Sequence, residues 1–318
     1  MKKLFCIGDF TVDLIIPFGD MKRAVKGFGD GKKRTVPKIY TQAGGGIANT
    51  SVVLARLGQQ PRIVSKIGTD SCGLDAIEDI KKEGVNTENL ILDKASAFII
   101  GSVVDEDGER YFNGWQRSDA GNGALLKGET AGIDVSETVW VHSGGINIHD
   151  DTEHEREIVA FLRRCKQAGA TVSFDINLRY ETSGYSEGRR RIYEQIFELA
   201  DIILGSGIDE FGPVTGLSDL AEAGRALAGN SKTVVIRNSS KPVLLINKGQ
   251  ESIHPTCKVQ QLHTIGAGDS FDGGFIAAAM YGKDMKTCVE WGNRCAAATI
   301  SHIAPMTVPT LSELESIS

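Results

Sequence analysis

The sequence lacks any apolar run that approaches the roughly 20 residues of a membrane-spanning helix. Its first ten residues, MKKLFCIGDF, carry a basic pair, but the apolar run behind that pair is too short for a secretory signal peptide. The six cysteines form no C-x-x-C pair, and no histidine stands at zinc-finger spacing. These absences predict a reduced, cytoplasmic protein with free thiols.

An excess of positive charge is also missing. The formal net charge is −6, which argues against a nucleic-acid partner. The phosphate-binding patterns G-x-x-x-x-G-K-[ST] and G-x-G-x-x-G do not occur, so the P-loop and Rossmann fingerprints are absent. Phosphate ligands themselves remain compatible with an acidic protein, because they usually arrive with Mg²⁺. The 318 residues, 41% of them hydrophobic, suffice for one large α/β domain or two smaller ones.

Short apolar runs alternate with longer helical patterns along the chain. The runs predict buried strands at 3–8, 61–68, 138–145, 170–176, 200–205 and 232–237. The segments between them predict helices at 47–57, 73–84, 153–168, 187–199 and 218–228. Alternation of this kind predicts an α/β fold with a mostly parallel sheet that is covered by helices on both faces.

Two regions interrupt this alternation. Residues 12–42 and 96–117 contain alternating strand patterns with turn signals. We expect them to form one small β-sheet that is inserted into a single domain of residues 1–318 and lies over the main sheet as a lid. A third segment, HDDTEHERE at 149–157, bunches histidines and acids in a way that suggests a metal. We interpret it as a solvated helix start, because acidic residues favour the first turn of a helix.

The segment HTIGAGDSFDGGF at 263–275 predicts a loop that turns into a helix near Asp269. Its glycines allow backbone N–H groups to converge, and the helix start favours an anion. The small residues Gly273, Gly274, Ala277 and Ala278 should pack closely on a neighbouring element. Asp269 on its own would be explained equally well as a helix cap. Beside a phosphate cradle, however, a carboxylate suits phosphoryl transfer as the acceptor of the proton of the attacking hydroxyl.

TIGAGDSFDGGF resembles the carboxy-terminal signature of the ribokinase or PfkB-type carbohydrate kinases. Other segments resemble further motifs of that family, in the expected order: GDFTVD at 8–13, AGGGIANTSVVLARLG at 43–58, KIGTDSCGLDAIEDIKKEGVNTENL at 66–90, DINLR at 175–179 and WGNRCAAATIS at 291–301. The resemblance covers nearly the whole chain. It implies a ribokinase-like three-layer sandwich and transfer of the γ-phosphoryl group of MgATP to a hydroxyl of a sugar or sugar acid.

The resemblance also implies a role for each matching residue. It makes Asp269 the catalytic base, with Gly266, Ala267 and Gly268 as the anion hole. The sugar contacts would be Asp13, Gly44, Gly45 and Asn49, and Arg117 would reach the carboxylate of a sugar acid. The nucleotide side would comprise Asn177, Arg179, Glu210, Arg237, Asn238 and Asn293. Glu210 would organise Mg²⁺ through water, and a monovalent cation is a further expected cofactor. A homodimer through the lid is the expected assembly.

Departures from the family pattern gather on the nucleotide side. His263 stands where the family usually has Asp, Gly207 stands where it usually has Asn, and IRNSSKP at 236–242 replaces a Thr-x-Gly turn. An Arg237 directed at the phosphates would compensate electrostatically. Two alternatives therefore stay open, namely a nucleoside kinase of the same fold and a sugar-binding protein derived from a kinase with a weakened ATP site.

Overall fold

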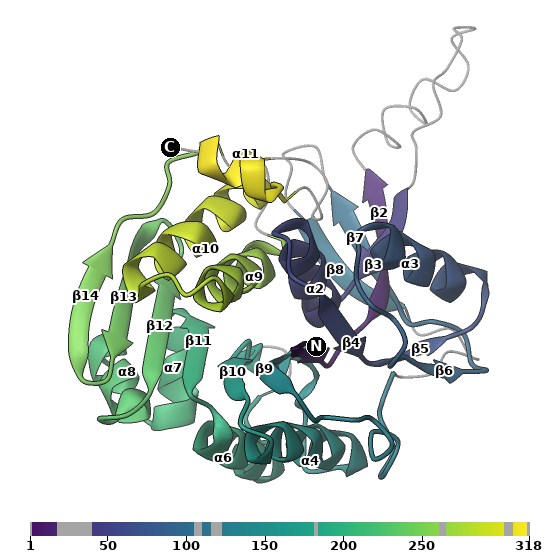
Figure 1. Ribbon diagram of the computed structural model, residues 1–318, viewed down its shortest axis with the longest axis horizontal. Coiled ribbons are helices and arrows are strands. Elements are labelled where there is room, and N and C mark those ends of the chain that lie inside the picture. Colours follow the sequence, from purple (N-terminus) through teal and green to yellow (C-terminus); the bar gives the residue numbers. More distant parts are fainter. Residues whose placement is uncertain are drawn as a thin grey trace, which may run out of the picture.

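The computed structural model describes residues 2–17, 40–104, 110–115, 123–180, 184–260, 265–301 and 308–316. Its centre is an eight-stranded sheet (Figure 1) with the order β14-β13-β12-β11-β10-β9-β1-β4. The strands are β1 (Lys3–Ile7), β4 (Pro61–Val64), β9 (Thr138–Gly144), β10 (Thr171–Asp175), β11 (Ile202–Ser206), β12 (Thr233–Asn238), β13 (Lys241–Asn247) and β14 (Gln250–His254).

The six strands from β4 to β12 run parallel, and β13 and β14 add an antiparallel hairpin at one edge. The hairpin turns at Lys248 and Gly249, whose φ angles of 49° and 80° suit a tight two-residue connection. The alternation of strands and helices predicted the parallel part of the sheet. It did not predict the hairpin, because the sequence after β12 has no helical segment to mark a crossover.

Helices cover both faces of the sheet (Figure 1). One face carries α2 (Gly46–Arg56), α9 (Ala267–Met280) and α10 (Met285–Ile300), and the other carries α4 (Glu153–Gln167), α6 (Glu187–Leu199), α7 (Gly207–Thr215) and α8 (Leu220–Ala228). Alternate residues of β1 point to opposite faces of the sheet. Leu4 and Cys6 pack in the hydrophobic core under α2, α9 and α10. Phe5 and Ile7 pack in the core on the other face. A strand that is buried on both faces reads as the continuous apolar run seen in the sequence.

Helix α9 packs tightly between α2 and α10, as its run of small residues predicted. A Cβ atom on Gly273 would lie 2.5 Å from Val53 Cβ in α2, and one on Gly274 would lie 2.7 Å from the Trp291 carbonyl oxygen in α10. Ala277 and its neighbour Ala278 are fully buried. The close approach sets the position of the start of α9 relative to both helices.

A separate four-stranded sheet has the order β3-β2-β7-β8. Its strands are β2 (Thr11–Pro17), β3 (Tyr40–Gly44), β7 (Ile99–Val104) and β8 (Arg110–Trp115), so they come from the two regions that interrupt the alternation of strands and helices. Helix α3 (Ser71–Lys82) packs beside it, and α11 (Leu311–Ser316) lies near α10 (Figure 1). The three-layer α/β sandwich with a small separate sheet is thereby confirmed. No helix in the described ranges is both long and apolar enough to cross a membrane.

The single strand predicted at 61–68 is wrong in its extent. Strand β4 ends at Val64, and β5 (Lys66–Gly68) leaves the main sheet to pair with β6 (Ile91–Asp93). Between them the Ser65 hydroxyl donates to the Gly8 carbonyl oxygen at 2.6 Å. This bond ties the point of departure to the end of β1, a contact that no local pattern encodes.

The segment 149–157 does contain a helix start, and a reciprocal pair of bonds between Thr152 and Glu155 caps it. The predicted solvation holds for the exposed residues of this segment, namely His149, Asp150, Thr152, Glu153 and Arg156. It is wrong for His154, Glu155 and Glu157, which are only 8%, 2% and 6% exposed. Their side chains accept backbone N–H groups of adjacent loops, which replaces the lost hydration. These acids anchor loops, and no group of three potential ligands in the described ranges is arranged to hold a metal.

Candidate active site

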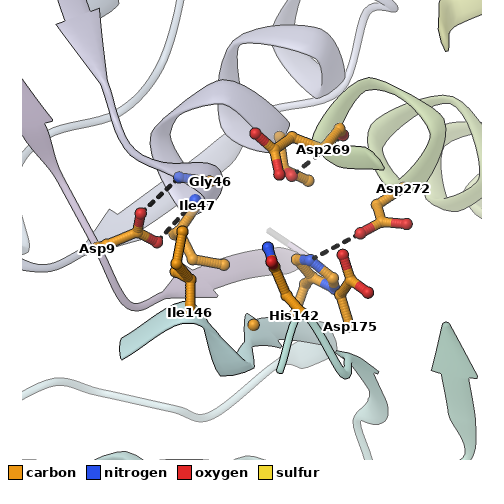
Figure 2. A pocket seen from close by; sticks show the side chains of 11 residues that line it. Asp9, Gly46, Ile47, His142, Ile146, Asp175, Asp269 and Asp272 are labelled. Atoms are coloured by element: carbon orange, nitrogen blue, oxygen red, sulfur yellow. Dashed lines mark hydrogen bonds and ion pairs between the residues drawn. The ribbon is translucent and has the colours of Figure 1, made fainter. Parts of the chain in front are cut away.

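A cavity that is open to solvent lies where the parallel strands end (Figure 2). In open α/β sheets the carboxyl ends of the strands are the usual place for ligands. The cavity wall combines four aspartates with glycines, isoleucines and three further polar residues: Asp9, Gly46, Ile47, Thr50, His142, Gly144, Ile146, Asp175, Asn177, Asp269 and Asp272. The predicted base therefore faces an open space at the expected edge of the sheet.

Gly266 begins α9 from the left-handed region, with a φ of 72° that favours glycine. The first helical hydrogen bond runs from the Ser270 N–H to the Gly266 carbonyl oxygen at 2.9 Å. The N–H groups of Ala267, Gly268 and Asp269 precede that bond and have no partner within the helix. A helix start of this kind favours an anion, so the anion hole stays a prediction that this geometry permits.

The side chains of α2 hold Asp269 from the other side. The Asn49 amide donates to Asp269 Oδ2 at 2.9 Å, and the Thr50 hydroxyl donates to the Asp269 carbonyl oxygen at 3.1 Å. Burial raises the pKa of the Asp269 carboxyl above its ordinary value, and the bond from Asn49 opposes part of that rise. A carboxylate with a raised pKa is a stronger base towards a hydroxyl than an exposed one.

Asp9 caps α2 from a distance (Figure 2). Gly45, the residue before the helix, supplies no capping side chain and has a φ of 97°. The Asp9 carboxylate, two residues beyond β1, instead accepts the N–H groups of Gly46 at 2.5 Å and Ile47 at 3.1 Å. Burial and the charge of Asp269 raise the pKa of Asp9 to about 6. Asp9 therefore fixes the helix whose next turn presents Asn49 to Asp269.

Arg237 stands behind the start of α9 in a buried cluster of charges. Its guanidinium lies 2.8 Å from Asp175 Oδ1 and 3.0 Å from Asp272 Oδ1, and it donates to the Gly268 carbonyl oxygen at 2.9 Å. Burial works against the charge of Arg237, but the two carboxylates outweigh it and raise the pKa of the guanidinium. Burial and the neighbouring Asp175 raise the pKa of Asp272 well above its ordinary value.

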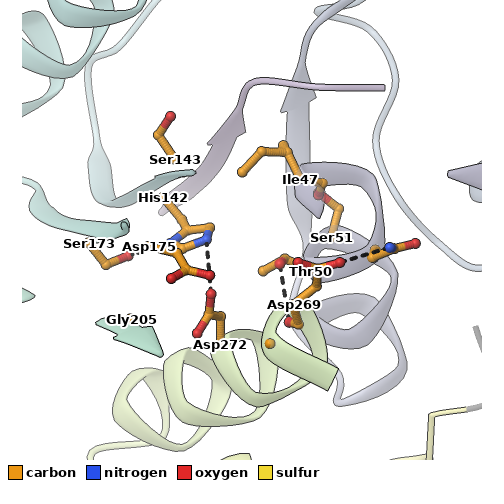
Figure 3. Close-up of polar contacts among 12 residues, drawn as sticks. Ile47, Thr50, Ser51, His142, Ser143, Ser173, Asp175, Gly205, Asp269 and Asp272 are labelled. Atoms are coloured by element: carbon orange, nitrogen blue, oxygen red, sulfur yellow. Dashed lines mark hydrogen bonds and ion pairs between the residues drawn. The ribbon is translucent and has the colours of Figure 1, made fainter. Parts of the chain in front are cut away.

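His142 lines the cavity and makes polar contacts beneath it (Figure 3). Its Nδ1 lies 2.9 Å from the Ser173 hydroxyl, which also accepts the indole N–H of Trp140 at 2.8 Å. The His142 Nε2 lies 3.9 Å from Asp272 Oδ2. Burial lowers the pKa of His142 to about 4, so the ring is neutral at pH 7. A neutral ring here adds no positive charge to the acidic wall of the cavity.

The predicted sugar residues gather between the small sheet and α2. Asp13 in β2 lies against Gly44 in β3, because a Cβ atom on Gly44 would stand 2.0 Å from Asp13 Oδ1. Gly45 leads directly into α2, where Asn49 reaches Asp269. Arg117 lies outside the described residues, so its predicted contact with a sugar acid stays a prediction.

The predicted nucleotide residues follow the ends of β10, β11 and β12 and the middle of α10. Burial and the charge of Asp175 raise the pKa of Glu210 to about 7, although the Ser206 N–H donates to its carboxylate at 2.7 Å. Asn177 lines the cavity, and Arg179, with a φ of 50°, is exposed and close enough to lower the pKa of Glu210.

Three more residues of that group stand apart from the cavity wall. Asn238 ends β12 at an irregularity in its pairing with β13. The buried Asn293 donates its amide to the Pro255 carbonyl oxygen at 2.9 Å. Arg237 is directed at protein groups, as described above. His263, the departure just before the anion hole, lies outside the described residues.

Asp9, His142, Asp175 and Asp272 were not among the predicted site residues. The sequence could have identified Asp9 and Asp175, because each lies at or just after the end of a predicted parallel strand. The carboxyl ends of parallel strands meet at one edge of the sheet, where ligands usually bind. Asp272 comes three residues after Asp269 and so lies near it on a helix. His142 offered no signal, because a polar residue inside an apolar run is normally explained by packing.

The fold is the ribokinase-like α/β fold, and the cavity with its carboxylates fits a phosphotransferase. Comparison with known proteins agrees, because the model of the pfkB family carbohydrate kinases matches residues 1–311. The fructokinase of Vibrio alginolyticus is 27% identical over 99% of this chain and 98% of its own. The 5-dehydro-2-deoxygluconokinase of Lacticaseibacillus casei is 25% identical over 85% of this chain and 84% of its own.

A crystal structure of the fructokinase from Vibrio cholerae O395, bound to fructose, ADP and calcium, superposes with a TM-score of 0.81. It is 24% identical and covers 100% of this chain and 99% of that one. At this identity the superposition establishes the fold. The chain belongs to the pfkB family of carbohydrate kinases, as its motifs predicted.

Proposed function

We propose that the protein transfers the γ-phosphoryl group of MgATP to a hydroxyl of a sugar or sugar acid, with Asp269 as the base. One observation carries this proposal. The Asp269 carboxylate lies on the cavity wall, held by Asn49 at 2.9 Å, in the same helical turn as the N–H groups of Ala267 and Gly268. A proton acceptor and an anion-binding helix start in one place are what phosphoryl transfer to a hydroxyl requires.

In this mechanism the attacking hydroxyl donates its proton to Asp269 as its oxygen bonds to phosphorus. The N–H groups of the Gly266–Gly268 segment stabilise the charge on the transferring group. Asn49 keeps the carboxylate turned towards the cavity, and Asp9 keeps Asn49 in place by capping α2. Burial of Asp269 favours its protonated form, which makes acceptance of the proton easier.

The sugar would lie between α2 and the small sheet, where Asp13, Gly44 and Gly45 come together. Carboxylate oxygens accept hydroxyl hydrogens, and glycines let a polar ring approach the backbone. One relative is named a fructokinase and another a 5-dehydro-2-deoxygluconokinase. These names support a neutral sugar and a sugar acid equally well as the substrate. Arg117 is the residue that would favour the acid.

The nucleotide would lie over the ends of β10 to β12, near Asn177, Arg179, Asn238 and Asn293. Glu210 fits a nearby divalent cation, because burial and the charge of Asp175 raise its pKa and a cation would offset both effects. No three ligating side chains in the described ranges converge on one point, which suits an ion held largely by water and phosphate oxygens. Mg²⁺ bound there supplies neutralisation of the phosphate charge.

Two finer features also belong to the proposal. The four-stranded sheet ends in β3 and β8, and an open sheet edge is a place for a second copy to pair, so we expect a homodimer through this sheet. All six cysteines lie in the described ranges and none forms a disulfide, which supports a cytoplasmic location. Light scattering of the purified protein tests the first of these features.

The test is a panel of ketoses, aldoses, sugar acids and nucleosides, each assayed with millimolar MgATP. We expect turnover of at least one sugar, and Asp269→Asn should lower kcat by about 10²–10⁴, the range for a lost general base. Asp219→Asn is the matched control, because it makes the same substitution near a helix start, at a residue that caps α8 and does not line the cavity. Tight sugar binding with no transfer to any acceptor would favour the sugar-binding alternative.

A further inference from the structure

Arg237 invites a question that the proposed mechanism does not answer. The resemblance predicts it at the nucleotide phosphates, yet its side chain is only 11% exposed and each of its three guanidinium nitrogens has a protein partner. It stands at the carboxyl end of β12, level with Ser206 of β11. From there it reaches across to the first turn of α9.

The guanidinium connects three elements that carry the site. Nη2 pairs with Asp175 at the end of β10, and Nε donates to the Gly205 carbonyl oxygen of β11 at 3.3 Å. Nη1 pairs with Asp272 of α9 and donates to the Gly268 carbonyl oxygen. Its carbon lies 5.5 Å from the centre of the Phe271 ring. The planar fork of arginine can serve all these directions at once, which an ammonium group cannot.

The contact with Gly268 acts directly on the reacting end of the helix. The Gly268 carbonyl belongs to the same planar peptide unit as the N–H of Asp269. A hydrogen bond to that carbonyl fixes the orientation of the unit and polarises its N–H. A Cβ atom on Gly268 would stand 3.1 Å from Nη1, so glycine is the residue that permits this approach.

We propose that Arg237 is a positioning residue for phosphoryl transfer, which holds the Gly268–Asp269 peptide unit and Asp272 so that the base and the anion-binding helix start keep their geometry. It acts through the peptide unit and does not contact the nucleotide. This inference rests on the proposed function of Asp269 and the helix start. It also accounts for the departure from the family pattern at IRNSS, because the arginine there serves the base.

Steady-state kinetics distinguish a positioning role of Arg237 from direct binding of the nucleotide. A positioning residue contributes to the transition state, so Arg237→Ala should lower kcat on the order of 10², the scale of a small misplacement of reacting groups. KM for ATP should change less than about threefold, because Arg237 does not contribute to binding of ATP in the ground state. Arg237→Lys keeps the positive charge but loses the planar fork of donors. Its kcat should therefore lie between those of the wild type and Arg237→Ala. Arg225→Ala, which loses an exposed pair with Glu251, is the matched control and should match the wild type.

Two outcomes would overturn the proposal. A raised KM for ATP with an unchanged kcat in Arg237→Ala would show that Arg237 contacts the nucleotide. Wild-type values of both kcat and KM would show that Arg237 has no role in the reaction. If Arg237→Ala does not fold, the same comparison of kcat with KM in Arg237→Lys decides the matter.

A measurement without turnover keeps this inference separate from the proposed function. Hydrogen–deuterium exchange of peptides over residues 265–280 should be faster in Arg237→Lys than in the wild type, with α10 unchanged. If the wild type phosphorylates no acceptor, the proposed function fails, but faster exchange would still support the anchoring of the helix start. Unchanged exchange over 265–280 would refute the anchoring even in an active kinase.

Discussion

Gly46 is a single residue on which the shape of the cavity depends. A Cβ atom there would lie 3.1 Å from Asp269 Oδ1 and 3.6 Å from Asp9 Oδ1 (Figure 2). Its φ is not in the left-handed region, so alanine can adopt the backbone. The methyl of Gly46→Ala would therefore fill the space next to the base and leave the helix intact. We expect kcat/KM for the sugar to fall at least about tenfold through this steric exclusion.

Gly132→Ala serves as the control for this change. Nothing lies within 4 Å of a Cβ atom at Gly132, and its φ is not positive. Steady-state kinetics and thermal melts of the two variants are then comparable. A Gly46→Ala protein that melts and turns over like the wild type would show that the reacting hydroxyl does not approach Asp269 from this side.

Helix α9 is the element whose packing decides where Asp269, the proposed base, lies. Its Gly274 faces α10 so closely that a Cβ atom would stand 2.7 Å from the Trp291 carbonyl oxygen and 2.8 Å from Cys295 Sγ. A backbone oxygen cannot move aside as a side-chain end can. Gly274→Ala should therefore lower the free energy of unfolding by about 1–3 kcal/mol, the cost of overpacking a core. Urea denaturation measures it, and an unchanged midpoint would contradict the tight packing.

The start of α7 tests the nucleotide side. Gly207 has a φ of 65° and nothing within 4 Å of a Cβ atom, so a side chain has room but some strain. Asparagine tolerates this conformation better than most residues. If the missing amide weakens ATP binding, Gly207→Asn should lower KM for ATP about fivefold, the equivalent of roughly 1 kcal/mol for one hydrogen bond.

Gly207→Ala is the matched control for that experiment, because it carries a similar backbone strain without the amide. The two variants should be equally destabilised and should differ in KM for ATP. Equal KM values would mean that the side chain at this position does not reach the nucleotide.

The whole molecule concentrates carboxylates at one end of the sheet, and its stability should depend on pH accordingly. Burial and Asp175 raise the pKa of Glu210 from 4.5 to about 7 in the folded state. The folded protein therefore favours the protonated form. Its contribution to stability is fully present below pH 4.5 and is lost as pH rises through 7. The full shift would correspond to about 3 kcal/mol, and we expect on the order of 1 kcal/mol after solvent screening.

Thermal melts of the wild type and Glu210→Gln check this expectation. The variant stays neutral, so its Tm should gain on that of the wild type between pH 5 and pH 8. Added MgCl₂ should raise the wild-type Tm more at pH 8 than at pH 5. It should raise the Tm of Glu210→Gln less than that of the wild type. The exposed Glu222→Gln provides the control. A pH-independent difference in Tm would show that Glu210 does not titrate in this range.

Much of this architecture follows from local pattern. The runs at 3–8, 138–145 and 170–176 are mostly apolar because both of their faces are buried, and that predicts a parallel strand. The glycines around Asp269 predict an anion-binding helix start because unobstructed N–H groups are a local property of the backbone. The motifs in their order were sufficient to indicate the family.

Only the tertiary structure decided which charges meet. Asp9 caps a helix 37 residues away, Asn49 reaches Asp269 across 220 residues, and Arg237 turns to Asp175 and Gly268 instead of outward. Hydrogen bonds and ion pairs depend on distances of a few ångströms between atoms. The sequence by itself determined the strands, the helix starts and the family. The packing of α9 between α2 and α10 decided the electrostatics of the site, because only that packing brings distant side chains within bonding distance.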